Sequence, residues 1–305
     1  MKSNHSPYLG YLYAVLSAMC AGTIGIFSVK AISAGLPASA IAFYRCLFAF
    51  IFITIWFVLS GQFNQWLVYL KKFYLKIAVC AFWGVFILYT FETRAYKYNS
   101  VPIVVFLLLG SAILTTFVLS AILHKHRLRV YEIISCLLAI FGLGLIFGIY
   151  NIHALKVNLI GAVLAIAAGI GYGGFLAFSH KFRIGSGLII VNSLALFGLV
   201  YLFPAFIHSG FILPSIASLP FLLALVIIPT ICGFWLTTRA LTIIKSSTVS
   251  LIDLSEPLFA IILAYIVLNQ KLEFAQFTGG MFILGAVCIN YFGQNYRNFR
   301  KPAID

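Results

Sequence analysis

The chain has 305 residues, of which 63% are hydrophobic and 9% are charged, and its formal net charge is +14. A water-soluble domain typically has roughly 45–50% apolar and about 25% charged residues, so this composition excludes a soluble globular fold. The basic residues stand in short segments between apolar runs, which favours the loops of a membrane protein over a nucleic-acid-binding surface.

Ten apolar runs follow one another along the chain, and each is long enough to span a bilayer. A transmembrane helix needs about 20 mostly apolar residues. The expected helices lie at about 8–29, 37–60, 75–96, 100–123 and 130–150, and then at about 158–179, 186–207, 218–241, 246–268 and 274–293. We therefore predict an all-α membrane protein of ten transmembrane helices, with a first five-helix repeat at 8–150, a second at 158–293 and a basic tail at 294–305.

The distribution of Lys and Arg predicts the orientation of these helices. With the N-terminus in the cytoplasm, the inside segments hold thirteen basic residues and the outside segments hold four. Basic loops stay on the cytoplasmic side, so both termini are expected there. An odd number of helices in each half makes the second half enter the membrane from the opposite side. Such inverted repeats are typical of secondary transporters with a site near the midplane.

Short sequence matches between the two halves favour an internal duplication. Ala14-Val15-Leu16 recurs as Ala162-Val163-Leu164, 148 residues later. Thr93-Arg94-Ala95 recurs as Thr238-Arg239-Ala240, 145 residues later. Single matches arise easily by chance in a chain rich in Leu, Ala and Phe, but these two keep the same order and nearly the same spacing.

The sequence carries no signature of a metal, a cofactor or a catalytic centre. The six cysteines lie in apolar runs without a CxxC spacing, and His124 and His126 stand in a basic loop without further ligands. A phosphate-binding P-loop for ATP is missing, as is any nucleophile with a base beside it. We expect no cofactor, no metal and no enzymatic activity.

Three of the six acidic residues lie within apolar runs: Glu92, Asp253 and Glu256. A carboxylate at the bilayer centre costs roughly 2.5–3.5 kcal/mol or more, so each is expected to face a cavity or a partner. Asp253 and Glu256 share one helix face, and Pro257 removes a backbone donor beside them and breaks the helix. We predict a solute or proton site here, with a buried hydrogen bond that orders helix packing as the alternative. Two helix-end acids are expected to be solvated, Glu132 and Glu273.

Two basic residues stand at the same depth as two of these acids. Arg45 and Glu92 are expected in the outer half of the membrane, and Arg239 and Asp253 in the inner half. We hypothesise an outer and an inner ion pair that break alternately as the protein opens to each side. For Arg239 the alternative is snorkelling to the interface, which is also expected of Arg94.

Aromatic rings complete the candidate site, because a ring can stack on an organic cation or an aromatic solute. The rings considered for this role are Tyr172, Tyr89, Trp83 and Trp235. Most of the other rings are expected to face lipid or the core. Small residues at 167–174 recur at the spacing that lets helices approach closely, so packing is favoured there over a hinge.

Several motifs resemble those of EamA-type transporters in the drug/metabolite transporter superfamily. They are Phe43-Tyr44-Arg45-Cys46-Leu47, Ala95-Tyr96-Lys97-Tyr98, the stretch from Ser247 to Gln270 with its central Glu256-Pro257, and Gly279-Gly280 with Gly285. The likeness extends from about Leu9 to Phe292. The segment Gly110-Ser111-Ala112 departs from the family pattern, because such proteins usually carry a mid-helix proline there. Ser111 is a candidate solute contact.

The resemblance implies export or exchange of a small organic solute by alternating access in a bacterial-type inner (cytoplasmic) membrane. Together with the acidic midplane, it predicts a secondary transporter for a small polar metabolite such as an amino acid or an amine, with Glu256 as the candidate for proton coupling. The expected partners are the solute, the lipid bilayer and protons, and the chain is expected to act as a monomer or homodimer. The alternatives are a membrane-embedded enzyme acting on lipid and a channel.

Overall fold

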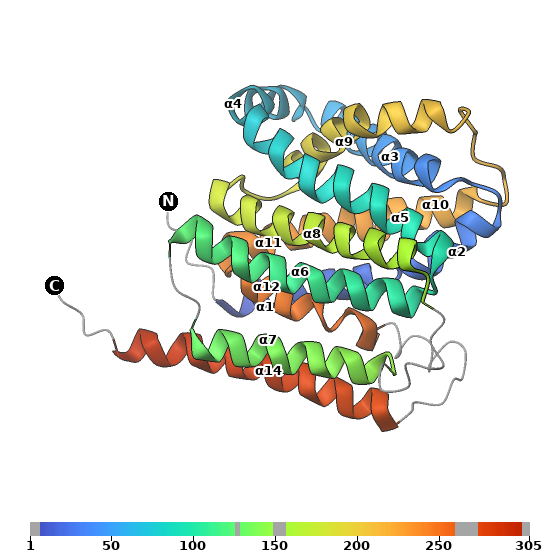
Figure 1. Cartoon of the computed structure of the whole chain (residues 1–305). Coiled ribbons are helices and arrows are strands. Elements are labelled where there is room, and N and C mark those ends of the chain that lie inside the picture. The colour runs from blue at the N-terminus through green and yellow to red at the C-terminus, as the bar shows by residue number, and fades with distance from the viewer. Residues whose placement is uncertain (1–6, 126–128, 149–156, 260–273, 301–305) are drawn as a thin grey trace.

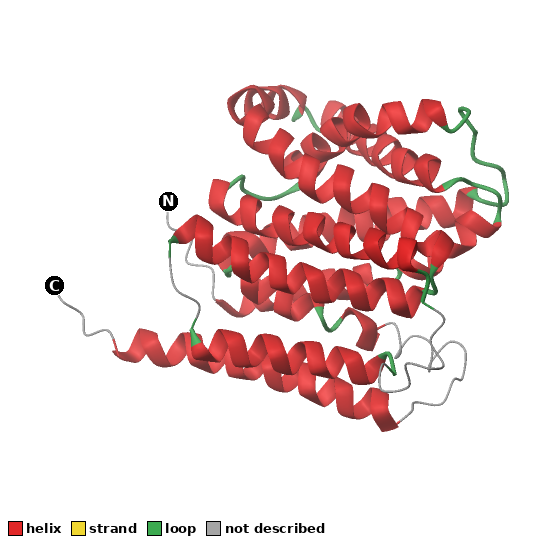
Figure 2. Cartoon of the chain, in the orientation of Figure 1, coloured by secondary structure: helices red, strands yellow, loops and turns green. Residues whose placement is uncertain are grey.

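The computed structural model describes residues 7–125, 129–148, 157–259 and 274–300. In this part of the chain every regular element is helical and no strand occurs, as Figure 2 shows. The all-α prediction is therefore confirmed for the described residues.

The helices of the first half run from residue 7 to residue 146. They are α1 (Pro7–Ala21), α2 (Ile24–Ser33), α3 (Ala38–Leu59), α4 (Phe63–Ala81), the π-helical segment η1 (Phe82–Ile87), α5 (Leu88–Tyr98), α6 (Val101–His124) and α7 (Val130–Ile146). Those of the second half are α8 (Leu159–Phe182), α9 (Leu188–His208), α10 (Leu219–Leu225), the π-helical segment η3 (Val226–Gly233), α11 (Phe234–Ile243), α12 (Ser246–Asp253) and α14 (Phe274–Arg300).

Eight of the described helices are long and apolar enough to cross a membrane, and α7 is a shorter apolar helix. The expected helix at 246–268 is described only as far as Phe259, so the predicted total of ten extends beyond the described residues. The third span is longer than expected and reaches from Phe63 to Tyr98. Its first half contains Lys71 and Lys72, whose exposed side chains interrupt the apolar run without ending the helix.

The two halves pack against each other with a pseudo-two-fold pattern. The first helix of each half contacts the third of the other, since α1 packs on α11 and α8 packs on α5. The fourth helix of each half likewise contacts the first of the other, through α6 with α8 and α12 with α1. The second helices, α3 and α9, and the fifth, α7 and α14, pack as pairs (Figure 1). This reciprocity is the architecture expected of two repeats.

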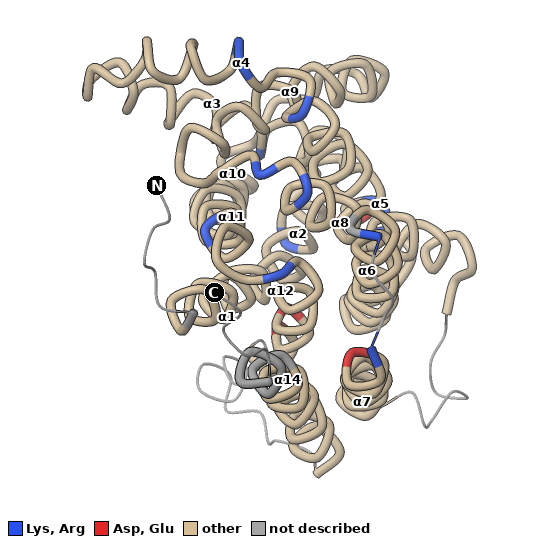
Figure 3. The backbone as a smooth tube through the Cα atoms, turned by 90° about the vertical axis from the view of Figure 1, so that its left-hand side faces the viewer, with Lys and Arg blue, Asp and Glu red and all other residues tan. Residues whose placement is uncertain are grey.

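Several basic residues lie at one end of the bundle. One end, at the left of Figure 1, is where α6 and α8 finish and α12 begins, and we call it the basic end for its residues Lys125, Lys181, Arg183 and Lys245. Figure 3 looks onto this end and shows Lys and Arg on several of its helices. The start of α1 and the end of α14 lie at the same end (Figure 1).

Glycines on α8 let two neighbouring helices approach it closely. An alanine methyl at Gly169 would collide with the hydroxyl of Ser111 and the backbone of α6. On the other side, a methyl at Gly174 would lie 2.5 Å from the ring of Trp83 in η1. Close packing is therefore the role of these small residues, as the sequence indicates.

The expectation that Glu132 is a solvated surface charge is wrong. Glu132 is 2% exposed, and its carboxylate accepts a hydrogen bond of 3.0 Å from the backbone N–H of Arg129 at the start of α7. Lys245, at the start of α12, lies 3.8 Å from the same carboxylate. The side chain is buried because it caps its own helix where α12 packs against α7.

Candidate functional site

Four interruptions of the helical backbone meet in the middle of the bundle. α1 and α2 are separated by a turn at Gly22 and Thr23, and α12 ends in a turn at Leu254 and Ser255. The third helix of each half contains a π-helical segment, η1 or η3. Irregular backbone at membrane depth is tolerated where it lines a cavity or is buried in protein, and π-helical segments are frequent at functional sites.

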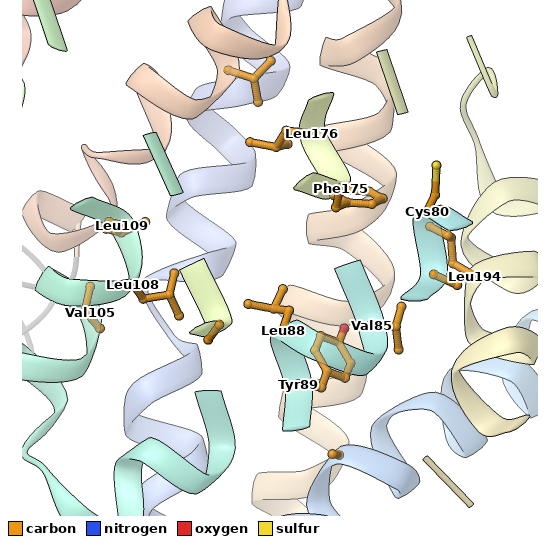
Figure 4. Close-up of a cluster of buried hydrophobic side chains, with 14 of the residues drawn as sticks. Cys80, Val85, Leu88, Tyr89, Val105, Leu108, Leu109, Phe175, Leu176 and Leu194 are labelled. Atoms are coloured by element: carbon orange, nitrogen blue, oxygen red, sulfur yellow. The ribbon is translucent and has the colours of Figure 1, made fainter. Parts of the chain in front are cut away.

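A cavity lies where these interruptions meet, and residues beside every one of them form its wall. Ala21 and Ile24 flank the α1–α2 turn, Gly233 belongs to η3, and Glu256 follows the turn after α12. The apolar wall includes Val105, Leu108 and Leu109 of α6 with Leu88 and Tyr89 of α5 (Figure 4). The remaining lining residues are Ser17, Arg45, Glu92, Tyr96, Tyr172, Pro229, Phe234 and Thr237. The space open to a water-sized group is about 50 Å³.

Equivalent positions of the two repeats face each other across this cavity. Shifting η1 by 145 residues places it at 227–232, inside η3. The same shift relates Tyr89 to Phe234, whose rings meet edge to face with centroids 6.0 Å apart. It also relates Glu92 to Thr237, and both line the cavity. The third helices of the two halves therefore supply matching walls that differ in charge.

Arg45 is held in this wall by two contacts with neighbouring helices. Its Nε donates a hydrogen bond of 3.1 Å to Thr230 Oγ1 in η3. Its guanidinium lies 3.9 Å from the ring centroid of Tyr89, a cation–π arrangement. Thr230 is itself fixed, because its hydroxyl donates to the carbonyl of Leu225 at 2.8 Å. A buried arginine thus enters the cavity in one orientation.

Arg45 and Glu92 form an ion pair without a hydrogen bond. Their Nη1 and Oε2 atoms are 3.7 Å apart, and the two residues are 0% and 5% exposed. Among the described residues, neither of these two atoms has a hydrogen-bond partner. A buried charged group without its hydrogen bonds is costly, so both atoms are available to a polar ligand that enters the cavity.

Glu256 enters the same cavity from the opposite repeat. It follows the turn at Leu254 and Ser255, and Pro257 comes directly after it. Because proline has no N–H, the carbonyl of Asp253 cannot receive the helical hydrogen bond from position 257. The break expected near Pro257 thus lies immediately before Glu256, and it brings the carboxylate into the cavity that also contains Glu92.

Asp253 is bound to Tyr172 rather than to Arg239. The Tyr172 hydroxyl donates a hydrogen bond of 2.9 Å to Asp253 Oδ2, which joins α8 to α12. Arg239 lies with its guanidinium 5.9 Å from the Trp235 ring, and no ion pair joins it to an acid in the described part of the chain. Of the two expected ion pairs, the structure brings together the Arg45–Glu92 pair and leaves Arg239 and Asp253 apart.

Three of the candidate solute contacts lie in helix packing and do not line the cavity. Ser111 donates to the carbonyl of Leu107 in its own helix at 2.6 Å and to that of Ile166 in α8 at 3.2 Å. Trp83 packs on α8 against Gly174, and Trp235 meets the ring of Tyr13 edge to face. The cavity retains Tyr172 and Tyr89 from the predicted rings.

Hydroxyl groups that the sequence did not single out also belong to the cavity. Ser17 of α1 and Thr237 of α11 are hydrogen-bonded to each other at 2.6 Å and both line the cavity, as does Tyr96. Thr237 could have been found from the sequence, because the 145-residue shift relates it to Glu92. Thr230 could not, since a threonine in an apolar run is common.

Comparisons with known proteins identify the family. The model of the EamA-like transporter family matches residues 8–148 and 159–292. A solved structure described as "Crystal structure of protein" is similar in fold, with a TM-score of 0.70 and 15% identity over 93% of this chain and 96% of that one. Among curated proteins, none matches this chain.

Proposed function

The chain belongs to the EamA-like transporter family, and on this premise we propose that it is a secondary transporter that moves a small polar organic metabolite by alternating access. We further propose ten membrane spans with both termini in the cytoplasm, and a location in a bacterial-type inner membrane. The two-repeat architecture, the multi-pass topology and the excess of basic residues on one side support this orientation.

The observation that carries the proposal is the pair of unsatisfied charged atoms in the cavity, Arg45 Nη1 and Glu92 Oε2. An amino acid carries both charges that these atoms require. Its carboxylate is complementary to Nη1 of Arg45, and its ammonium group is complementary to the carboxylates of Glu92 and Glu256. Tyr89 and Tyr172 add rings that can contact the organic part of the solute.

The size of the cavity supports alternating access rather than a continuous pore. A cavity needs about 10–15 Å³ of such space for each water molecule, so 50 Å³ corresponds to a few waters and is smaller than an amino acid. Solute entry therefore requires the helices to move apart. The interruptions in α1–α2, η1, η3 and α12 are the places where the backbone can bend with the least loss of helical hydrogen bonds.

Proton coupling is the second part of the proposal and concerns Glu256. Two carboxylates, Glu92 and Glu256, share the cavity with one arginine. If Glu256 releases its proton when a cationic group arrives and binds one when the solute leaves, solute movement is exchanged for proton movement. In this scheme the Arg45–Glu92 pair opens when the cavity is exposed to one side of the membrane. Arg239 approaches Asp253 when the cavity is exposed to the other side.

Transport by purified protein in liposomes tests the function. We expect saturable uptake or exchange of particular amino acids or amines, dependence on a pH gradient, and loss of both in Glu256→Gln. Lys71→Gln, a change at an exposed residue of α4, serves as the control and should transport normally. Conductance that does not depend on solute would favour a channel instead, and turnover of added phospholipid would favour a membrane enzyme.

A further inference from the structure

A second cavity lies at the opposite end of the bundle from the basic end. It is bounded by the connection between α2 and α3, the end of α5 and the start of α8, and its water-accessible volume is about 630 Å³. Its lining residues are Ile32, Gly35, Leu36, Pro37, Ala38, Ser39, Arg94, Lys97, Tyr98, Ile160, Leu164 and Ile212. None of them lines the central cavity.

The position of the second cavity on α5 separates it from the central cavity. Glu92 and Tyr96 face the central cavity, whereas Arg94 and Lys97 lie on the other side of the same helix. At 100° per residue, Arg94 is rotated by 200° from Glu92. The two cavities are thus on opposite faces of α5, and a ligand of the second one does not occupy the site proposed for the solute.

The walls of the second cavity are fixed relative to each other. Asn99 follows α5 and Asn158 precedes α8, and they are joined by two hydrogen bonds. The Asn99 amide donates to the carbonyl of Asn158 at 3.0 Å, and the backbone N–H of Asn158 donates to Asn99 Oδ1 at 2.8 Å. This connection holds Arg94 and Lys97 of α5 at a defined distance from the apolar side chains of α8.

The charge of this cavity is positive. Arg94 and Lys97 are three residues apart and therefore point to the same side of α5. Both are exposed, and in the described part of the chain neither forms an ion pair with an acid. Two cations without counter-charges at the mouth of a cavity are complementary to an anion, and arginine in particular forms paired hydrogen bonds with phosphate oxygens.

Apart from Ser39 and Tyr98, the remaining lining residues carry no polar side chain, and at the start of α8 this apolar wall continues onto the outer surface of the bundle. Ile160 and Leu164 line the cavity, and Leu159 and Val163 beside them are 77% and 58% exposed. A small inorganic anion could contact the cations but would leave this apolar surface uncovered. A phospholipid matches both features, because its phosphate lies at the depth where the helices end and its acyl chain lies along the helices below.

We propose that this cavity binds a phospholipid with a net negative headgroup, whose phosphate contacts Arg94 and Lys97 and whose acyl chain lies against the start of α8. A choline headgroup would bring a third cation close to these two, so the site discriminates between headgroups by charge. The aromatic ring of Tyr98, which is 43% exposed, lies beside the phosphate position as interfacial tyrosines do. This site is independent of the transport function proposed above.

Native mass spectrometry of the delipidated protein in detergent tests this proposal, with phosphatidylglycerol and phosphatidylcholine as the added lipids. We expect the wild type to prefer phosphatidylglycerol. Each basic side chain near a membrane surface contributes about fivefold to such binding, so Arg94→Gln/Lys97→Gln should bind phosphatidylglycerol about 30-fold more weakly. The single variants should each lose about fivefold. Lys71→Gln/Lys72→Gln removes the same charge from exposed positions of α4 and should bind like the wild type.

Three results would overturn the proposal. Equal losses in the two double variants would show that only the net charge of the protein matters. Equal binding of the two lipids by the wild type would show that the cations do not select the headgroup. Displacement of phosphatidylglycerol by millimolar glycerol phosphate or inorganic phosphate would show that the cavity binds a free phosphate group and not a lipid.

Discussion

Arg45 of α3 and Glu92 of α5 face each other in the central cavity with their charged atoms 3.7 Å apart, too far for a hydrogen bond. The hydrogen bond to Thr230 and the ring of Tyr89 set the position of the guanidinium, and in this position it is not within hydrogen-bonding distance of Glu92. This ion pair thus places two opposite charges in the central cavity, beside the four helix interruptions.

Arg45→Gln should destabilise the protein and reduce transport of the amino acid. It leaves Glu92 buried without a counter-charge, which typically costs about 3–5 kcal/mol. Thermal unfolding in detergent should show a clear loss of stability, and the double variant Arg45→Gln/Glu92→Gln should recover much of it without recovering transport. If the double variant were no more stable than the single one, the two residues would not be energetically coupled.

Arg45→Lys separates the charge from the shape of the guanidinium. Lysine keeps the positive charge but has no Nε to donate to Thr230 and no planar group to lie on Tyr89. We expect transport to fall at least about tenfold while stability changes by less than in Arg45→Gln. Thr230→Val, which removes the acceptor for Nε, should weaken solute binding in the same direction. Normal transport by Arg45→Lys would mean that orientation by Thr230 and Tyr89 is unimportant.

Tyr172→Phe should destabilise the contact between α8 and α12. It removes the hydrogen bond to Asp253, which is 3% exposed, and an unsatisfied buried acceptor costs about 1–3 kcal/mol. The loss should be smaller in the background of Asp253→Asn, because a neutral amide is less costly to leave unpaired than a carboxylate. Additive effects of the two changes on thermal unfolding would contradict a direct interaction.

Gly174→Ala should disturb the packing of α8 on η1, whereas Gly110→Ala should not. The added methyl at Gly174 meets the Trp83 ring, and overpacking of this kind costs typically about 1–3 kcal/mol. At Gly110 no neighbouring atom lies within 4 Å of the added methyl, so that variant should be at least as stable as the wild type. Similar unfolding temperatures for the two variants would argue against this close contact.

The charged part of the site was predictable from the sequence, because a charge in an apolar run is costly and requires a partner or a cavity. Arg45, Glu92 and Glu256 stand out for this reason, and all three line the cavity. Arg239 and Asp253 were paired on depth alone. Depth along a helix leaves the rotation about its axis undetermined, and the structure turns Asp253 towards Tyr172.

The apolar part of the site was not predictable in the same way. The segment η1 consists of apolar residues and a glycine, which do not distinguish a π-helical turn from an α-helical one. In η3, Pro229 indicates an irregular helix but does not specify a π-helical turn. Trp83 and Trp235 are large rings within spans, but 16% of the residues are aromatic, so ring size alone does not identify a solute contact, and these two rings serve packing. Which helix face meets the cavity follows from packing between segments far apart in the chain.

The most direct test of the central claim compares three solutes of similar shape in liposomes: a transported amino acid, the amine without its carboxylate, and the acid without its amino group. The wild type should transport the amino acid best, since both of its charges have partners in the cavity. Arg45→Gln should lose the preference for the amino acid over the amine, and Glu92→Gln should lose the preference for the amino acid over the acid. If both variants kept the order of preference of the wild type, the solute would not be bound between Arg45 and Glu92.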